Sequence, residues 1–341
     1  MTTFSEVEKI LESASYQKDA EGIFKSGREG YWSNLDKEEN IRFIEELKIS
    51  DPLEAVRKVI PQYEDVIFSP VREGALELLN IKAGSVAIDY GCMWGVLSIG
   101  MAKRGALVLA IDQTMDSLIF TSKRSKFEQV NNLICLQDDI RKVSLDNLAD
   151  FSIINGVLEW VPEFGAIELK KYYGKKIKKY YAGNPEETQG QFLAQVYRNL
   201  KKGGKLLLAI ENRFDYTHFL GKPDPHSNLL FTALLPRFLA DAVSKLFLGR
   251  PYVNYIYSFQ KLKELLAESG FKNIDLLMAH PDYRYPSLIL PYNGGVSRYH
   301  KYWVWREISW KRRTAYFVEY VLMKYFKARF FAPSIIAIAE K

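Results

Sequence analysis

The sequence has little cysteine or histidine and no long apolar run, and these absences exclude several classes of protein. Its 341 residues include only two cysteines, so we expect free thiols rather than a disulfide framework. None of the four histidines stands at metal-ligand spacing with a cysteine, so we expect no zinc centre and assign no metal ligands. No run of about 18 uncharged apolar residues occurs, and the N-terminus lacks the pattern of a signal peptide. We therefore expect a cytoplasmic protein without a membrane span.

The composition is that of an ordinary globular protein. Hydrophobic residues make up 48% of the chain and charged residues 26%, and the length suits one large α/β domain with additions or two modest domains. The formal net charge of +6 is a weak indication of an anionic partner, because many proteins share it.

Strand and helix patterns alternate through the middle of the chain. The strand candidates, such as VAIDY and LVLAID, are almost continuously apolar, which predicts a parallel sheet covered by helices on both faces. The predicted fold is therefore a doubly wound, Rossmann-like α/β sheet. We expect six segments: an N-terminal helical cap (1–80), the α/β core (81–211), a first insertion forming a lid (212–258), a continuation of the core (259–280), an aromatic and basic insertion that completes the lid (281–332), and a terminal core strand (333–341).

The stretch VAIDYGCMWG carries the strongest functional signal. Asp89 ends a predicted strand, and Gly91 and Gly95 follow it. Glycines let a ligand approach the backbone closely, whereas a carboxylate pairs with a cation and repels a pyrophosphate. The spacing is G-x-x-x-G rather than the dinucleotide G-x-G-x-x-G, so a ligand with an ammonium or sulfonium group fits best. Asp112, at the tip of the next strand, suits ribose hydroxyls but would serve a dinucleotide oxidoreductase equally well.

In their order and spacing these motifs resemble the class I S-adenosylmethionine-dependent methyltransferases. The resemblance runs from FSPVREGALELL to the terminal strand PSIIAIAEK, insertions excluded, and implies that this last strand is antiparallel. A weaker resemblance, carried by FSPVREGALELL, GVLEW, AIENRFDY and PDYRYP, points to a bacterial subgroup associated with glycan and natural-product biosynthesis. Met93 departs from the pattern, since the family commonly has glycine there, and its side chain would narrow the approach to the methionine moiety.

The resemblance implies S-adenosylmethionine as cofactor and assigns contacts to it. These are Asp89, Gly91, Cys92 and Gly95 for the methionine part, Asp112 and Gln113 for the ribose, Asp138, Asp139 and Ile140 for the adenine, and Asn155, Gly156 and Val157 for the floor beneath the methyl group.

Catalytic and acceptor-binding residues should come from loops at the carboxyl ends of the strands. A hydroxyl acceptor benefits from a base, and His218 or His226 in the polar loop after residue 211 is the first choice, with Glu159 as a further candidate. Either histidine could equally well only bridge loop backbone. Candidates for holding the acceptor, by stacking or hydrogen bonding, are Tyr31, Trp32, Trp160, Asn212, Arg213, Asp215, Asp282 and Tyr283.

Two segments mix basic and aromatic residues. KKYYGKKIKKYY (170–181) and the longer stretch 298–329 suit a nucleic-acid backbone or an anionic membrane surface, and a solvated helical face explains them as simply. With the apolar helix predicted in LLPRFLADAVSKLFLG, they suggest peripheral contact with the inner face of the membrane.

The leading hypothesis is a methyltransferase that acts on a small-molecule or glycan-like acceptor, at oxygen or nitrogen. An RNA-modifying methyltransferase and a noncatalytic adaptor with the same fold stay open as alternatives. The sequence identifies neither the acceptor nor the oligomeric state.

Overall fold

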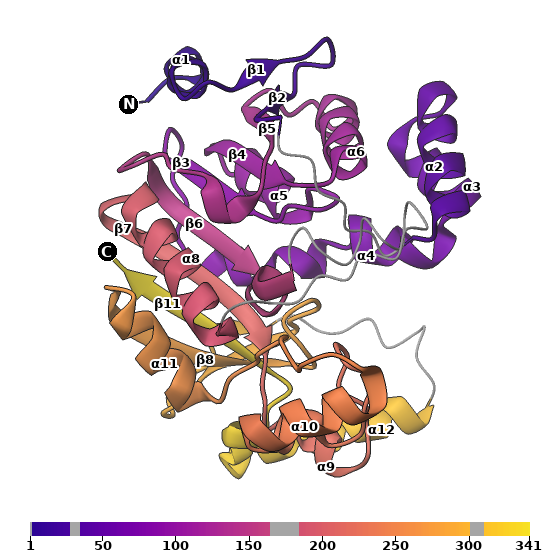
Figure 1. Cartoon of the computed structure of the whole chain (residues 1–341), viewed down its shortest axis with the longest axis vertical. Coiled ribbons are helices and arrows are strands. Elements are labelled where there is room, and N and C mark those ends of the chain that lie inside the picture. The colour runs from indigo at the N-terminus through magenta and orange to yellow at the C-terminus, as the bar shows by residue number, and fades with distance from the viewer. Residues whose placement is uncertain (1, 28–34, 164–183, 301–309) are drawn as a thin grey trace.

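Five parallel strands form the centre of the protein. The computed structural model describes residues 2–27, 35–163, 184–300 and 310–341, and Figure 1 shows the central sheet running through them. The parallel strands lie in the order β5-β4-β3-β6-β7, so the chain order reverses between β3 and β6. Their bounds are β3 Val86–Tyr90, β4 Leu107–Asp112, β5 Leu133–Gln137, β6 Ala149–Asn155 and β7 Leu200–Glu211.

The last strand of the chain enters this sheet antiparallel. β11 (Ser334–Glu340) lies between β7 and β8 (Lys272–His280), and Ile335 is paired with both Ile210 and Met278. The expected doubly wound sheet and its antiparallel terminal strand are thus confirmed. Since ligands of open α/β sheets bind where the strand order reverses, the carboxyl ends of β3 and β6 mark the binding crevice.

Side chains of each central strand alternate between two apolar layers. In β3, Ile88 and Tyr90 lie in the layer covered by α8 (Pro185–Asn199) and α11 (Phe259–Glu268). Ala87 lies in the other layer, against α5 (Val96–Lys103). Burial on both sides explains why these strands are apolar throughout rather than alternating. Helix α6 (Met115–Phe127) packs beside β4 and β5.

The N-terminal region adds helices and a small hairpin. The helices are α1 (Phe4–Ser13), α2 (Lys37–Ile49), α3 (Pro52–Val59) and α4 (Glu64–Phe68). The hairpin of β1 (Gln17–Lys18) and β2 (Phe24–Lys25) extends the sheet beyond β5, and its strands are too short for a sequence pattern to reveal. The sequence VREGALELLNIKAG suggests an α-helix ending at Gly84, but the structure has a 3-10 helix at Pro70–Leu78. Gly74, a poor helix former, lies there against the ring of Tyr299.

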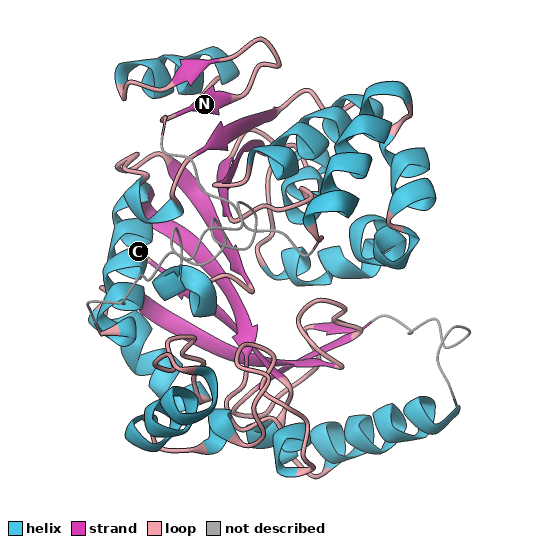
Figure 2. Ribbon diagram, turned by 45° about the vertical axis from the view of Figure 1, so that its right-hand side comes forward, coloured by secondary structure: helices cyan, strands magenta, loops and turns pink. Residues whose placement is uncertain are grey.

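Later segments form a helical layer at one end of the sheet. Figures 1 and 2 place α9 (Tyr216–Phe219), α10 (Arg237–Leu248) and α12 (Trp310–Tyr325) together at the lower end of the molecule. Two further strands, β9 (Leu288–Pro291) and β10 (Tyr299–His300), continue the sheet beyond β8. None of the helices in the described ranges is both long and apolar enough to cross a membrane.

A buried asparagine ties α8 to the central sheet. Asn199 is fully buried; its Nδ2 donates to the Tyr90 hydroxyl and the Val143 carbonyl, and its Oδ1 accepts from the Leu145 N–H at 2.8 Å. We expect Asn199→Ala to lower the free energy of unfolding by roughly 2–4 kcal/mol, because the buried Leu145 N–H loses its acceptor and the Tyr90 hydroxyl loses a donor, while the Val143 carbonyl still accepts from Gln195 Nε2. In the same urea titration, Asn184→Ala, which removes only the exposed N-cap of α8, should cost about 1 kcal/mol. Equal losses would contradict this account.

Candidate active site

The turn after β3 requires its two glycines. Gly91 and Gly95 both have positive φ, and an added Cβ would lie 2.7 Å from Val157 Cγ2 at the first and 2.5 Å from Thr121 Cγ2 at the second. Met93, between them, also has positive φ, and its N–H donates to Asp112 Oδ2 at 2.9 Å. The turn therefore folds back against the tip of β4, and its backbone is open to a ligand.

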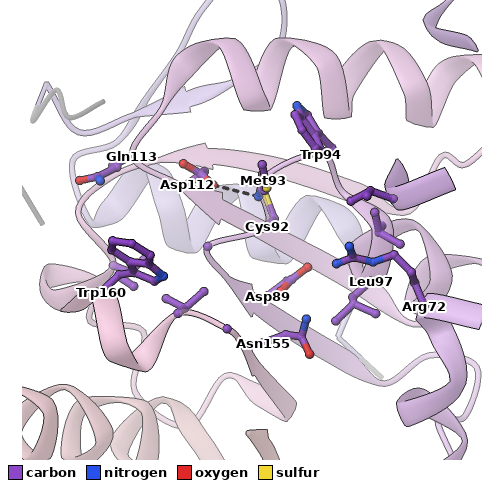
Figure 3. A pocket seen from close by; sticks show the side chains of 16 residues that line it. Arg72, Asp89, Cys92, Met93, Trp94, Leu97, Asp112, Gln113, Asn155 and Trp160 are labelled. Carbon is purple, nitrogen blue, oxygen red and sulfur yellow. Dashed lines mark hydrogen bonds between the residues drawn. The ribbon is translucent and has the colours of Figure 1, made fainter. Parts of the chain in front are cut away.

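A pocket of about 840 Å³, counting the part open to solvent, lies beside this turn (Figure 3). It is formed by residues from the carboxyl ends of β3, β4 and β6 and from the segment after β5. The structure brings together ten candidates from the sequence in its lining: Asp89, Gly91, Cys92, Asp112, Gln113, Ile140, Asn155, Gly156, Val157 and Trp160.

Two carboxylates lie at neighbouring strand tips in the pocket. Asp89 accepts a hydrogen bond from Ser98 Oγ at 2.6 Å, and its burial, together with the nearby Asp112, raises its pKa to about 6. Burial also raises the pKa of Asp112, although the Thr114 and Met93 N–H groups donate to its oxygens. The pocket thus concentrates acidic groups in a site of low polarity, which favours a cationic ligand.

Arg72 is a pocket residue that the sequence reasoning missed. It comes from the 3-10 helix before β3, and Figure 3 shows it reaching toward Asp89. Its side chain also lies over the ring of Tyr285. The motif FSPVREG contains it, but nothing in the sequence shows that this helix turns its arginine into the crevice. The other lining residues not assigned from sequence are Val66, Met93, Trp94, Val96 and Leu97.

Three cofactor candidates are not among the lining residues. Gly95 ends the turn at the start of α5 and packs against Thr121. Asp138 is buried and accepts from the Tyr16 hydroxyl at 2.8 Å and from Ser26 Oγ at 2.7 Å. Asp139 caps a short 3-10 helix and pairs with Arg141 at 2.6 Å. The two aspartates after β5 therefore anchor neighbouring backbone and the N-terminal segment.

A second cluster of polar side chains adjoins the pocket. His226 Nε2 lies 4.0 Å from both Glu159 Oε1 and Glu211 Oε2, and His226 Nδ1 lies 3.1 Å from Asp224 Oδ1. The ring of Trp160, which lines the pocket, packs edge-on against the His226 ring with centroids 5.0 Å apart. The Tyr283 hydroxyl donates to Glu211 Oε1 at 3.1 Å. We call Glu159, Glu211 and His226 the Glu-Glu-His cluster.

The two glutamates of the cluster have opposite pKa shifts. Burial, followed by the charge of Glu211, raises the pKa of Glu159 well above its usual range. Burial also opposes ionisation of Glu211, but the charges of His226 and Arg284 outweigh it and lower its pKa. Burial lowers the pKa of His226, yet Asp224 and Glu211 more than compensate, so the net shift is upward. Of the two neighbouring carboxyl groups, a proton is therefore favoured on Glu159 over Glu211.

Five other candidates make local contacts outside the pocket lining. His218 Nδ1 contacts the Lys222 carbonyl, and Asp215 caps α9. Asn212 and Arg213 donate to backbone carbonyls of the later segments, and Asp282 accepts from the backbone N–H of Arg284. Tyr31 and Trp32 lie outside the described residues, as does the segment 170–181.

The sheet order, the antiparallel β11 and the glycine turn after β3 define the class I methyltransferase fold. No family model matches the chain. Over 132 residues the chain is 32% identical to ubiquinone biosynthesis O-methyltransferase of several Coxiella burnetii strains, and this alignment covers 38% of the chain and 53% of the relative. The chain thus spans about half the length of the curated relatives it matches. The similarity confirms the resemblance to methyltransferases that the motifs indicate.

Solved structures resemble the protein more weakly. Phosphoethanolamine N-methyltransferase 2 of Haemonchus contortus, solved with S-adenosyl-L-methionine, has a TM-score of 0.47 and 14% identity, over 88% of this chain and 60% of that one. A possible histamine N-methyltransferase of Thermotoga maritima has a TM-score of 0.42 and 12% identity, over 85% and 99% of the two chains. Likeness of this strength does not bear on the function of the protein.

We expect Asp89→Asn to stabilise the protein at neutral pH. Because folding raises the pKa of Asp89 from 3.8 to about 6, the ionised side chain opposes folding, and this penalty develops between about pH 4 and pH 6. Asparagine keeps the bond from Ser98 without the charge. At pH 7.5 the variant should gain roughly 1–3 kcal/mol in urea unfolding, and the gain should vanish near pH 4. A loss of stability at pH 7.5 would contradict the assignment.

Proposed function

We propose that the protein is an S-adenosylmethionine-dependent methyltransferase whose methyl donor occupies the pocket beside the β3 turn. One observation carries this proposal: Asp89 and Asp112 lie at adjacent strand tips and flank an open glycine turn. Carboxylates there would pair with the ammonium group and accept from the ribose hydroxyls of the donor, whereas they would repel the pyrophosphate of a dinucleotide. In this proposal Ile140 contacts the adenine, and Asn155, Gly156 and Val157 form the floor; their presence in the pocket lining supports these roles.

The proposed reaction needs little covalent help from the protein. The sulfonium–methyl bond breaks as the acceptor forms a new bond to the methyl carbon. Sulfur keeps the electron pair and becomes a neutral thioether, while the acceptor's proton passes to a base or to solvent. Because the displacement is in line, the main tasks are to align the two reactants and to exclude water.

We propose that the acceptor enters from the side of Trp160 and the Glu-Glu-His cluster. The segments 212–258 and 281–332 contribute His226 and Tyr283 to this side, which supports their role as a lid. The named activity of the curated relative, an O-methyltransferase, favours oxygen as the methylated atom. A small-molecule or glycan-like acceptor with a hydroxyl group fits a polar wall next to an indole ring.

We further propose that the end of the molecule formed by α10 and α12 rests on an anionic membrane. Large apolar side chains are exposed there: Phe238, Leu246 and Phe247 on α10, and Trp310 and Phe317 on α12. The sequence of α12 carries four basic residues against one glutamate, Glu319, which is buried. Apolar residues flanked by basic ones suit the interface of anionic lipids, and such contact would bring a lipid-linked acceptor to the enzyme.

Isothermal titration with S-adenosylmethionine tests the donor assignment. The full chain should bind one equivalent, and Asp112→Asn should weaken binding about tenfold or more, since a charged hydrogen-bond acceptor is lost. Asp139→Asn, an acid at the next strand end that lies outside the pocket lining, is the matched control and should bind as the wild type does. Tight binding of NADH with no binding of S-adenosylmethionine would overturn the proposal.

Flotation with vesicles of phosphatidylcholine and phosphatidylserine tests the membrane surface. We expect the wild type to float at low salt and Phe247→Glu to float several-fold less, because a charge replaces an exposed apolar anchor. Ile49 is an exposed apolar residue at the end of α2, outside the surface formed by α10 and α12. Ile49→Glu is therefore the control and should not change flotation. The membrane proposal fails if the wild type does not bind the vesicles. It also fails if light scattering shows a dimer that Phe247→Glu disrupts, because the surface would then be a contact between two copies of the chain.

A further inference from the structure

Three potential metal ligands converge beside the proposed donor pocket. Glu159 follows β6 in a 3-10 helix, Glu211 ends β7, and His226 lies in the first insertion. One ligand atom from each lies within 4.8 Å of the others. Residues far apart in the sequence therefore meet at one point, which spacing along the chain cannot reveal.

The carboxyl groups of this cluster receive few hydrogen bonds from other side chains. Within the described part of the chain, no N–H or O–H group outside the pair donates to either Glu159 oxygen or to Glu211 Oε2, and the two carboxyl groups face each other. The Glu159 side chain is only 1% exposed, so bulk solvent does not reach its carboxyl group. Asn254 Nδ2 donates to the Glu159 backbone carbonyl at 3.1 Å, which fixes the backbone and leaves the carboxylate facing His226 and Glu211. Buried carboxylate oxygens without donors are costly unless a cation binds them.

His226 is oriented as metal-binding histidines are. Its Nδ1 faces Asp224 Oδ1, and Asp224 is itself held by Ser227 Oγ and by the His226 N–H. A carboxylate accepts, so Nδ1 donates, and the Nε2 atom of the neutral ring then presents its lone pair toward the two glutamates. This carboxylate–histidine arrangement fixes the tautomer and makes the ring a stronger ligand.

We propose that Glu159, Glu211 and His226 bind one divalent metal ion. Two carboxylates and an imidazole suit Zn²⁺ or Mn²⁺, and three protein ligands leave at least one coordination position open. A tetrahedral ion with bonds of about 2.1 Å separates its ligand atoms by about 3.4 Å. A shift of the two carboxylate oxygens by roughly half an ångström toward His226 Nε2 would shorten the present distances of 4.0 Å to about this value.

The site adjoins the proposed position of the methyl group. Tyr283, whose hydroxyl bonds to Glu211, packs so closely on Gly156 that a Cβ there would lie 2.3 Å from its oxygen. Gly156 and Trp160 line the donor pocket, and Trp160 packs on His226. If the proposed function is correct, the open position faces the acceptor, where the ion would hold a hydroxyl oxygen and lower its pKa. The substrate class is then an oxygen acceptor able to ligate a metal.

Direct titration of the full chain with metal tests the site without any methyl transfer. After dialysis against a chelator, wild-type protein should bind one equivalent of Zn²⁺ by calorimetry and raise its melting temperature on binding. Substitution with Co²⁺ should give visible ligand-field bands that show nitrogen and oxygen ligands. These readouts need no variant, so absence of stoichiometric binding overturns the proposal.

Variants then locate the ion. Glu159→Gln and Glu211→Gln should each weaken binding at least tenfold, while Glu319→Gln should leave it unchanged. Glu319 is the matched control because it is also buried and bonds to a histidine, His280, at 2.9 Å. Retained binding in both cluster variants would place the metal elsewhere and refute the site. Titration of the same chelated protein with S-adenosylmethionine separates the two proposals, since donor binding without metal binding contradicts only this inference.

Discussion

Buried negative charge at one edge of the sheet is the constraint on which the functional part of this structure depends. Acids lie at the carboxyl ends of three strands, and Glu159 follows β6. Asp89 precedes the last residue of β3, and Asp112 and Glu211 end β4 and β7. Carboxylates cost free energy when they leave water, and in this crevice hydrogen bonds from Ser98, Thr114 and Met93 offset only part of that cost. The fold is stable enough to keep them because the apolar layers on both faces of the sheet lie behind them. The proposed donor and the proposed metal ion would each place a positive charge beside these acids.

The sheet and the donor half of the site could be predicted because their signals are local. The strands β3 and β4 are short apolar runs, and an acid or glycine at or just beyond their ends forms the crevice, as in VAIDYG and LVLAID. Parallel strands align their carboxyl ends, so residues such as Asp89, Asp112 and Asn155 meet in space although they are separated in sequence. Predicting the strands therefore predicted most of the lining.

The remaining site residues depend on contacts that no local pattern encodes. Asp138 directly follows β5, one position beyond the residue that pairs with Asp112, and it bonds to Tyr16 and Ser26 because the N-terminal hairpin packs on that edge. Arg72 reaches the pocket only because a 3-10 helix, rather than the expected α-helix, precedes β3. Histidine spacing along the chain predicted no metal site, and the site proposed here could not be read from that spacing, because Glu159, Glu211 and His226 come from three separate elements.

The two halves of the crevice are built by different parts of the chain, and this explains why the donor is easier to infer than the acceptor. The donor half consists of strand ends and the turn after β3, whose geometry is set by backbone pairing and by Gly91 packing on Val157. The proposed acceptor half consists of side chains from the insertions that pack on core residues. His226 packs on Trp160, and Tyr283 packs on Gly156. A change in either insertion would therefore alter the acceptor side and leave the donor side intact. Under the proposed function, acceptor specificity therefore depends on tertiary contacts between the insertions and the core.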